Sequence, residues 1–286
     1  MTTVLYDRAI TRTAKALRNG DAIAIKSPLA ADSNEAACDQ DFPRVRSLPL
    51  VAHATKLRGT RRAMVAAGLR KVLFALVFFH IWYIGVTTIT VACFAFVDPA
   101  ATTLSIYRKY VDGWIIIRPL PTDLERIPKT ARRMLVSIED YKFYEHHGID
   151  FEAFERAYEV NQQIGRPMYG GSTLTMQTAR TIFLVPFKSY LRKYLEVIVA
   201  FELEILLSKE RILELYFSWA EWGKGVFGIE AASRLYNKAP VAKLNATQMA
   251  RLMAVLSSPI RFTPATLSKS KLLTWRYEFL LDRYVR

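Results

Sequence analysis

The chain has 286 residues, a formal net charge of +14 and two cysteines. This length is enough for one or two domains, each with a core of its own. The cysteines are Cys38 and Cys93, so residues 98–286 can hold neither a disulfide nor a thiolate metal site. Cysteine chemistry is therefore excluded from the larger part of the chain, and the basic balance favours an anionic partner.

Residues 72–97 contain no Asp, Glu, Lys or Arg and are strongly apolar. Because a helix of about 20 such residues crosses the hydrocarbon core of a bilayer, we predict a transmembrane signal anchor over residues 71–97. Basic residues crowd its N-terminal flank and Asp98 follows it, so the positive-inside rule places the N-terminus in the cytoplasm and residues 98–286 outside. The stretch is too far from the chain start for a cleaved signal peptide. Within it, His80 fits a tolerated, helix-facing residue better than a proton relay.

Residues 1–70 mix short apolar patches with polar ones and show no sustained period, which predicts a mostly disordered cytoplasmic tail. Met64 is an alternative start of the chain, and the sequence leaves this open. Residues 1–71 hold 13 Lys/Arg against 6 Asp/Glu, a balance that fits a membrane surface better than nucleic acid. Residues 98–286 hold 27 Lys/Arg against 20 Asp/Glu, which suits an anionic lipid headgroup or a pyrophosphate.

Residues 98–286 predict one mainly α domain. An apolar stripe at i, i+3, i+4 and i+7 starts at Ala131 and delivers Glu139 to the C-terminal end of a helix that a proline opens. Later helices are expected to begin after residues that can cap them, namely Asp150, Ser172, Ser189, Ser208 and Asn245. Two further predictions are a final helix from about Leu272 to Tyr284 and a short extended piece from Trp114 to Arg118.

The segment SIEDYKFYEHHGID places two carboxylates at the end of the first of these helices. Glu139 and Asp140 are followed by Phe143 and His146, so we expect the carboxylates at the wall of a cleft. A glutamate in such a wall suits a general base that works near neutral pH. The alternative is a solvated acidic pair that closes a helix. The histidines fit a hydrogen-bonding scaffold better than a metal site.

The segment GGSTLTMQTAR predicts a helix start with Ser172 as its cap. With that cap, Thr173, Gln177 and Arg180 share one face at i, i+4 and i+7. The two preceding glycines would let an anion approach the free N–H groups of the helix start. A hydroxyl, an amide and a guanidinium in one row suit a phosphate or a sugar, and the alternative is a solvated polar face.

The segment LRKYLE places Arg192, Lys193 and Glu196 on one side of the following helix. A single such triplet is most often an intrahelical ion pair worth only about 0.3–0.5 kcal/mol. Here, however, two carboxylates and three basic residues recur in three consecutive polar segments of an otherwise apolar region. Together with the anchor, they indicate an enzyme that transfers a sugar from an anionic leaving group at a membrane surface.

These segments occur in an order that resembles a known family. The motifs are E-D-x-x-F-x-x-H-x-G at 139–148, G-G-S-T-x-x-x-Q-x-x-R at 170–180, R-K-x-x-E at 192–196 and S-K-x-x-I-L-E-x-Y at 208–216. They look like the signature set of the peptidoglycan glycosyltransferases, glycosyltransferase family 51. Residues 221–238 are most similar to the monofunctional, single-span members. The resemblance covers about residues 105–285.

The resemblance implies a lysozyme-like, two-lobed α fold whose smaller lobe, between the first two motifs, touches the membrane. It also implies the polymerisation of lipid II into β-1,4-linked glycan, with inversion at the donor sugar. Glu139 would be the general base for the acceptor 4-hydroxyl. Glu196 would act with basic residues on the donor pyrophosphate, often with a divalent cation such as Mg²⁺ or Mn²⁺. Substrate binding would involve the other motif residues, which are Asp140, Phe143, His146, Ser172, Thr173, Gln177, Arg180, Arg192 and Lys193.

Departures from the family pattern bear on activity. The second motif usually ends Q-Q-x-x-K-N, where this chain has Met176 before Gln177 and Arg180-Thr181 at the end, and Ser218 stands where the family usually has asparagine. Arginine keeps the charge of lysine but not its point geometry. Both glutamates are present, so an active polymerase is favoured over a weakened, membrane-anchored scaffold that binds lipid II or glycan. A lytic hydrolase is a third alternative, but it would have no use for basic residues around a pyrophosphate.

The expected location is the bacterial inner membrane, with a single pass and a periplasmic catalytic domain. The implied partners are lipid II, the growing glycan strand, the membrane and other proteins of cell-wall synthesis or division, with no nucleic acid. No transpeptidase segment follows Arg286 in this sequence, so cross-linking is expected to take place elsewhere.

Overall fold

The computed structural model describes residues 50–117, 119–165 and 170–286. Residues 63–286 form one compact unit. Helices make up most of the described residues, and extended structure among them is confined to a short two-stranded sheet and an isolated bridge. The prediction of a mainly α fold is confirmed, whereas the lysozyme-like, two-lobed arrangement stays a prediction.

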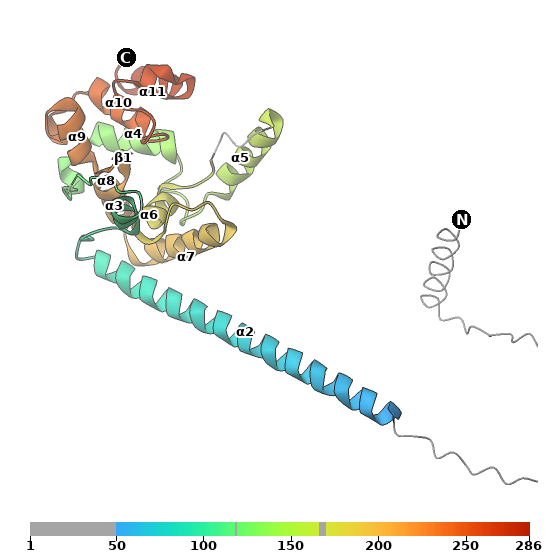
Figure 1. The fold of residues 1–286 in the computed structure, drawn as a ribbon. Helices are drawn as coiled ribbons and strands as arrows, with labels where there is room; N and C mark the ends of the chain where they lie inside the picture. The colour runs from blue at the N-terminus through green and yellow to red at the C-terminus, as the bar shows by residue number, and fades with distance from the viewer. Residues whose placement is uncertain (1–49, 118, 166–169) are drawn as a thin grey trace, which may run out of the picture. The chain divides into compact units, whose positions relative to one another are not determined.

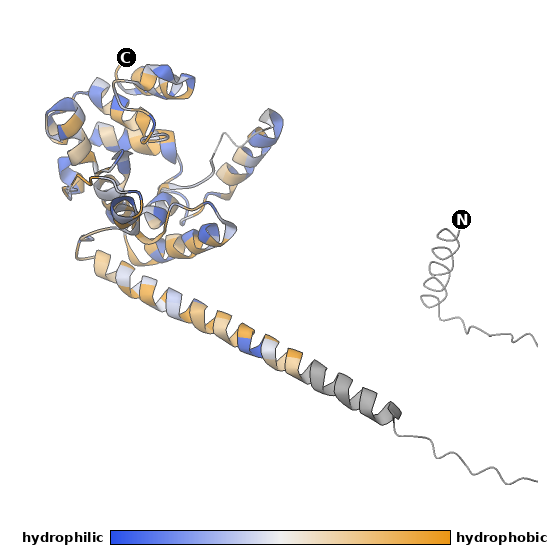
Figure 2. Cartoon of the chain, viewed as in Figure 1, coloured by the Kyte–Doolittle hydropathy of each residue, from blue (hydrophilic) through white to orange (hydrophobic). Residues whose placement is uncertain are grey.

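The helix α2 (Leu50–Phe94) contains the predicted anchor. Its segment Met64–Phe94 is long and apolar enough to cross a membrane, and hydrophobic residues dominate it in Figure 2. The helix ends at Phe94, shortly before the predicted boundary. It includes residues 50–70, which differs from the prediction of a mostly disordered tail. The rest of that prediction, residues 1–49, lies outside the described residues.

Contacts at its C-terminal end join α2 to the domain. Arg211 donates from Nε to the carbonyl oxygen of Phe94 at 2.7 Å and from Nη2 to a carboxylate oxygen of Asp98 at 2.8 Å. The last carbonyl groups of a helix have no partner within the helix, so the guanidinium supplies the missing hydrogen-bond donor at this end. Val91 is fully buried and belongs to the domain core. The last turns of α2 therefore pack as part of the domain.

The core lies among α4 (Lys129–Glu139), α6 (Leu174–Phe183), α7 (Tyr190–Leu206) and α8 (Lys209–Trp219) (Figure 1). The helix α8 is central, because most of its residues from Ile212 onward are buried. In α4 the predicted stripe faces this core, and Ala131, Met134 and Leu135 have no exposed surface. That burial fixes the end of α4, where Glu139 lies, against the rest of the domain.

The remaining helices surround this core. They are α3 (Thr103–Tyr110), α5 (Phe151–Ile164), α9 (Ile229–Asn237), α10 (Ala246–Val255) and α11 (Lys271–Tyr284), with short 3-10 turns η1 (Leu124–Arg126), η2 (Val241–Lys243) and η3 (Leu267–Lys269). The caps predicted for α5, α7, α8 and α10 are confirmed, since each capping side chain accepts a backbone N–H of the first turn. The predicted final helix is also present as α11, whereas α3 and α9 were not predicted.

A small hairpin follows α8. Strand β1 (Glu221–Gly223) pairs antiparallel with β2 (Val226–Phe227), and Gly225 in the turn has a φ of +71° that favours glycine. The N–H of Ile117 donates to the carbonyl oxygen of Gly225 at 2.9 Å, and Ile117 bridges to Val226. The predicted extended piece therefore contributes this bridge, and its last residue, Arg118, lies outside the described residues.

The helix α5 begins after its cap Asp150 and ends at Gly165, which has a φ of +71°. It lies apart from the central helices in Figure 1, and Phe151, Phe154 and Tyr158 are exposed on it. The smaller lobe was predicted for this region, of which residues 166–169 lie outside the described part. Gly171 then passes so close to α5 that an added Cβ would lie 2.6 Å from the Cα of Phe154. This glycine is therefore needed for packing.

Candidate active site

Glu139 is held from two sides at the end of α4. Arg276 of α11 donates from Nη2 to its Oε1, and Gln177 of α6 donates from Nε2 to its Oε2 at 3.2 Å. The side chain of Glu139 is 12% exposed and that of Arg276 is 10% exposed. A carboxylate offers about four lone-pair sites, so both oxygens can still accept another donor. The arrangement fixes the carboxylate and leaves it able to accept a proton.

Tyr216 of α8 extends this set of contacts. Its hydroxyl donates to Oε1 of Gln177 at 3.2 Å, which leaves the amide nitrogen of Gln177 directed at Glu139. Burial raises the pKa of Tyr216 well above its usual value, and the nearby Glu139 carboxylate adds to this shift. Tyr216 therefore stays a neutral hydrogen-bond donor. The sequence-based interpretation missed both Tyr216 and Arg276.

Asp140 and His146 form part of the frame behind Glu139. The Nε2 atom of His146 lies 2.9 Å from Oδ2 of Asp140, and Nδ1 of His146 accepts the N–H of Gly148 at 3.1 Å. The same Asp140 carboxylate accepts the N–H of Leu174, the first residue of α6, at 2.8 Å. Phe143 is fully buried, with the ammonium of Lys209 over its ring at 4.7 Å. Asp140 connects the end of α4 to the start of α6, and it also lines a cavity of about 50 Å³ together with Glu139, Ser172 and Thr173.

The start of α6 differs from the prediction, because the cap is Thr173 and not Ser172. The Thr173 hydroxyl accepts the N–H of Met176 at 3.1 Å and donates to the carbonyl oxygen of Gly148 at 2.6 Å. With the N–H of Leu174 bound to Asp140, the expected anion site at this helix start is already filled by the protein's own groups. Ser172 lies outside the helix and accepts from Nζ of Lys193 at 2.7 Å.

The cluster on α7 is built around a buried carboxylate. Glu196 has no exposed surface, and it accepts from Nη1 of Arg192 at 2.7 Å and from Nζ of Lys193 at 2.9 Å. Arg192 also donates from Nε to the carbonyl oxygen of Phe187 at 2.6 Å. Removing one partner of such a pair leaves a buried charge uncompensated, which costs about 3–5 kcal/mol. Glu196 therefore holds the two cations in fixed positions.

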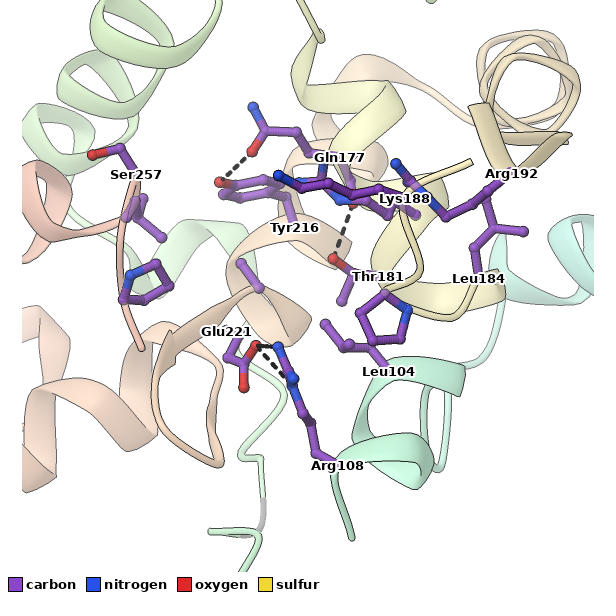
Figure 3. Close-up of a pocket in the computed structure, with 15 residues that line it drawn as sticks. Leu104, Arg108, Gln177, Thr181, Leu184, Lys188, Arg192, Tyr216, Glu221 and Ser257 are labelled. Atoms are coloured by element: carbon purple, nitrogen blue, oxygen red, sulfur yellow. Dashed lines mark hydrogen bonds and ion pairs between the residues drawn. The ribbon is translucent and has the colours of Figure 1, made fainter. Parts of the chain in front are cut away.

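A cavity of about 310 Å³ lies between this cluster and α8 (Figure 3). Its lining includes Gln177 and Tyr216 together with four basic residues, which are Arg108, Arg180, Lys188 and Arg192. Arg108 is neutralised by Asp112 and Glu221, at 2.8 Å and 3.0 Å. Within the described part of the chain, neither Arg180 nor Lys188 forms an ion pair with an acidic side chain. In Figure 3 the Lys188 side chain extends towards Tyr216.

The predicted site residues are thus brought together in two groups. Gln177, Arg180 and Arg192 line the 310 Å³ cavity, and Glu139, which lines the smaller cavity beside it, accepts from Gln177. Asp140, Phe143 and His146 support these residues from behind, and Ser172 and Lys193 contact each other beside them. Lys188 was missed because an isolated lysine in a loop resembles any surface lysine.

The described residues contain no group of three His, Cys, Asp or Glu side chains that could hold a metal ion. The carboxylates of Glu139 and Glu196 are each bound by two protein donors. These residues do not form a ready-made cage for a resident cation.

Comparison with known proteins agrees with this arrangement. The model of the Transglycosylase family matches residues 118–285, more than half of the chain. The chain belongs to the transglycosylase family. A biosynthetic peptidoglycan transglycosylase of Burkholderia multivorans is 35% identical over 212 residues, which cover 70% of this chain and 85% of that protein. One of Caulobacter vibrioides is 40% identical over 174 residues, which cover 61% of this chain and 75% of that protein.

Arg180 lines the cavity, and the other three positions where the chain departs from the usual transglycosylase pattern are buried. Met176 is 2% exposed and its sulfur lies 4.0 Å from Nζ of Lys193. The hydroxyl of Thr181 donates to the carbonyl oxygen of Gln177 at 3.0 Å, and that of Ser218 accepts the N–H of Thr122 at 3.3 Å. These three departures are accommodated by local packing or a hydrogen bond.

Proposed function

We infer that this chain is a peptidoglycan glycosyltransferase that polymerises lipid II into glycan strands. The observation that carries this function is the Glu139 carboxylate, connected through Gln177 and Tyr216 to a cavity. Two cations of that cavity, Arg180 and Lys188, have no acidic partner among the described residues. A diphosphate is already a competent leaving group. The site therefore needs only a base for the attacking hydroxyl and positive charge for the departing diphosphate.

The reaction is a single displacement with inversion. The acceptor 4-hydroxyl oxygen forms a bond to C1 of the donor sugar, while the bond from C1 to the diphosphate oxygen breaks and that electron pair leaves with the diphosphate. The hydroxyl proton passes to Glu139. Arg180 and Lys188 stabilise the negative charge that develops on the diphosphate, and Arg192 adds to them from the edge of the cavity.

Glu196 acts through the cations that it holds. Because its two oxygens are bound by Arg192 and Lys193, it has no direct path to the reacting atoms in this structure. We propose that it is a positioning residue, which keeps both basic side chains beside Ser172 and the cavity. Its burial makes this position rigid, since a buried carboxylate must keep its partners.

Polymerisation of labelled lipid II by the purified full-length chain in detergent tests the function. We expect long products that lysozyme digests to small fragments. A chain that binds lipid II without elongating it would be the scaffold alternative, which neither the site nor the relatives favour. Cleavage of finished glycan without lipid II turnover would be the hydrolase alternative.

We further propose a location in the bacterial inner membrane, with the N-terminus cytoplasmic and the domain periplasmic. Arg70 and Lys71 precede the apolar part of α2 and Asp98 follows it, which supports this orientation. The polymerisable substrate is exposed on the outer face, where the domain would then lie. Other proteins of cell-wall synthesis or division remain proposed partners, to be sought by cross-linking in cells.

A divalent cation, Mg²⁺ or Mn²⁺, is proposed to arrive with the diphosphate rather than to reside in the protein. Mg²⁺ is usually bound by substrate phosphates and only one or two carboxylates. Since the carboxylates of the site have protein partners, the diphosphate oxygens would hold most of its coordination. Chelation should lower turnover and added Mg²⁺ or Mn²⁺ should restore it, whereas full activity in chelator would reject this proposal.

A further inference from the structure

A second cavity, of about 500 Å³, lies between α4 and α11, and we call it the α4–α11 groove. Its lining combines three arginines with aromatic rings, namely Arg132, Arg133, Arg283, Tyr141, Tyr144, Phe279 and Tyr284. It shares no lining residue with the cationic cavity beside Tyr216. The groove is therefore a separate feature of the same domain.

The positive charge of the groove is not neutralised by the protein. Within the described ranges, none of Arg132, Arg133 and Arg283 forms an ion pair with a carboxylate. The guanidinium of Arg133 lies over the ring of Tyr284 at 5.8 Å, and Nε of Arg132 is buried without a hydrogen-bond partner in the structure. Arg133, Arg283 and Tyr141 are exposed, so an incoming ligand can reach them.

The groove leads away from the general base. On α4, Arg132, Val136 and Glu139 lie at i, i+4 and i+7, and on α11 the residues Arg276, Phe279 and Arg283 lie at i, i+3 and i+7. Two contacts join the helices: Arg276 pairs with Glu139, and the hydroxyl of Tyr284 donates to the carbonyl oxygen of Arg133. With a rise of about 1.5 Å per residue, the groove extends roughly 10 Å from the catalytic glutamate.

We propose that the α4–α11 groove binds the growing glycan strand, with its arginines on peptide carboxylates and its aromatic rings against sugar rings. This rests on the proposed function. The strand carries carboxylates on the peptides of its muramoyl sugars, and guanidinium groups bind carboxylates with two parallel hydrogen bonds. The end of the strand that carries the diphosphate occupies the cationic cavity, so the remaining sugars must leave the site in another direction. Tyr141 lines both the groove and the small cavity that contains Glu139, so the groove offers that path.

Product length is the property that separates this proposal from the function itself. We expect Arg133→Ala with Arg283→Ala to weaken strand binding about tenfold, the loss of two charge-assisted contacts, and thus to shorten products more than it slows lipid II consumption. Arg133→Lys with Arg283→Lys should keep most of the length. The matched control is Arg234→Ala with Arg286→Ala, which removes the same charge from exposed arginines that pair with neighbouring acids outside the groove.

Binding gives a second readout. A fluorescent, soluble glycan oligomer with its peptides should bind the full-length chain in detergent, and the same oligomer without peptides should bind less. Wild-type product length in the alanine pair, or an equal loss in the control pair, would overturn the proposal. Tight binding of the peptide-free oligomer would also overturn the carboxylate role. If wild-type protein forms no polymer at all, the proposed function fails instead. Melting temperatures identify a misfolded variant. If the double alanine variant is misfolded, the single variant Arg283→Gln is tested in its place.

Discussion

At the scale of single residues, Glu139 is distinguished by its partners more than by its exposure. It accepts from Arg276 and Gln177, which come from two other helices. Such fixed contacts orient a base toward one substrate position, and misplacement by about 1 Å can cost a hundredfold in rate.

Glu139→Gln should abolish polymerisation while lipid II binding persists, because the amide keeps the shape of the side chain and cannot take the proton. A general base typically contributes about 10²–10⁴-fold. Turnover of labelled lipid II and its binding should be measured on the same preparation. A variant with more than about a tenth of wild-type turnover would contradict the role of Glu139.

Arg276→Gln should lower kcat about tenfold and leave the KM for lipid II nearly unchanged, because the loss acts on the alignment of the base. Arg276→Lys should recover part of kcat by restoring the charge. The guanidinium also donates from Nε to the carbonyl oxygen of Ala254 at 3.2 Å, so melting temperatures are needed as a control. Lower stability with full kcat would give Arg276 a role in packing alone.

Arg180→Ala should raise the KM or cut turnover about tenfold, since Arg180 lines the cavity and has no acidic partner in the part of the chain that the structure describes. Arg180→Lys should preserve most activity. Gln177→Ala should instead lower kcat, because Gln177 contacts the base. Arg234→Ala is the matched control, as this exposed arginine lies outside the cavity and pairs with the buried carboxylate of Glu230. Wild-type kinetics in Arg180→Ala would place the diphosphate on Lys188 and Arg192 alone.

At the scale of elements, the anchor helix α2 contacts the catalytic helix α7 directly. The hydroxyls of Thr87 and Thr88 donate to Oε1 of Glu202 at 3.0 Å and 3.1 Å, and the rings of His80 and Tyr194 lie 5.6 Å apart. The other oxygen of Glu202 is buried without a hydrogen-bond partner in the structure. Since α7 also carries Glu196, the anchor can influence where the site cations lie.

Burial raises the pKa of Glu202 from 4.5, and the weaker effect of the two threonine hydroxyls opposes the shift. The folded state then binds more protons than the unfolded state. The stability of the fold should therefore be highest below pH 4.5 with respect to this group and decline as pH rises towards the raised value. Glu202→Gln should remove that decline in melting temperature. Glu159→Gln, at an exposed position of α5, should retain it, and an identical decline in both variants would exclude Glu202 as the source.

At the scale of the whole molecule, an apolar helix leads into a basic domain whose site faces an anionic substrate. The proposed topology predicts that an export-dependent reporter fused after Arg286 is active, and that a cytoplasmic reporter is active when fused before Lys56. Reversed activities would place the domain in the cytoplasm, away from the polymerisable substrate. The controls are the same two reporters exchanged between the two fusion positions.

Local sequence patterns predicted several helix starts, the position of Glu139 and the family of this protein. The caps Asp150, Ser189, Ser208 and Asn245 were predicted because a helix start depends on a hydrogen bond to a residue about three positions away. The position of Glu139 at the end of α4 follows in the same way from the apolar stripe of that helix. The motif order also indicated the family and its chemistry.

Only the tertiary structure decided which motif residues line the site and which ones hold the helices together. Arg276 reaches Glu139 from 137 positions away, a separation over which no local period carries information. Thr173 replaces Ser172 as the cap because its hydroxyl also finds the carbonyl oxygen of Gly148, and Asp140 turns inward to the N–H of Leu174. Local hydrogen bonds determine where helices begin and end. The contacts between helices depend on packing of the whole chain, and they determine which polar side chains face the cleft.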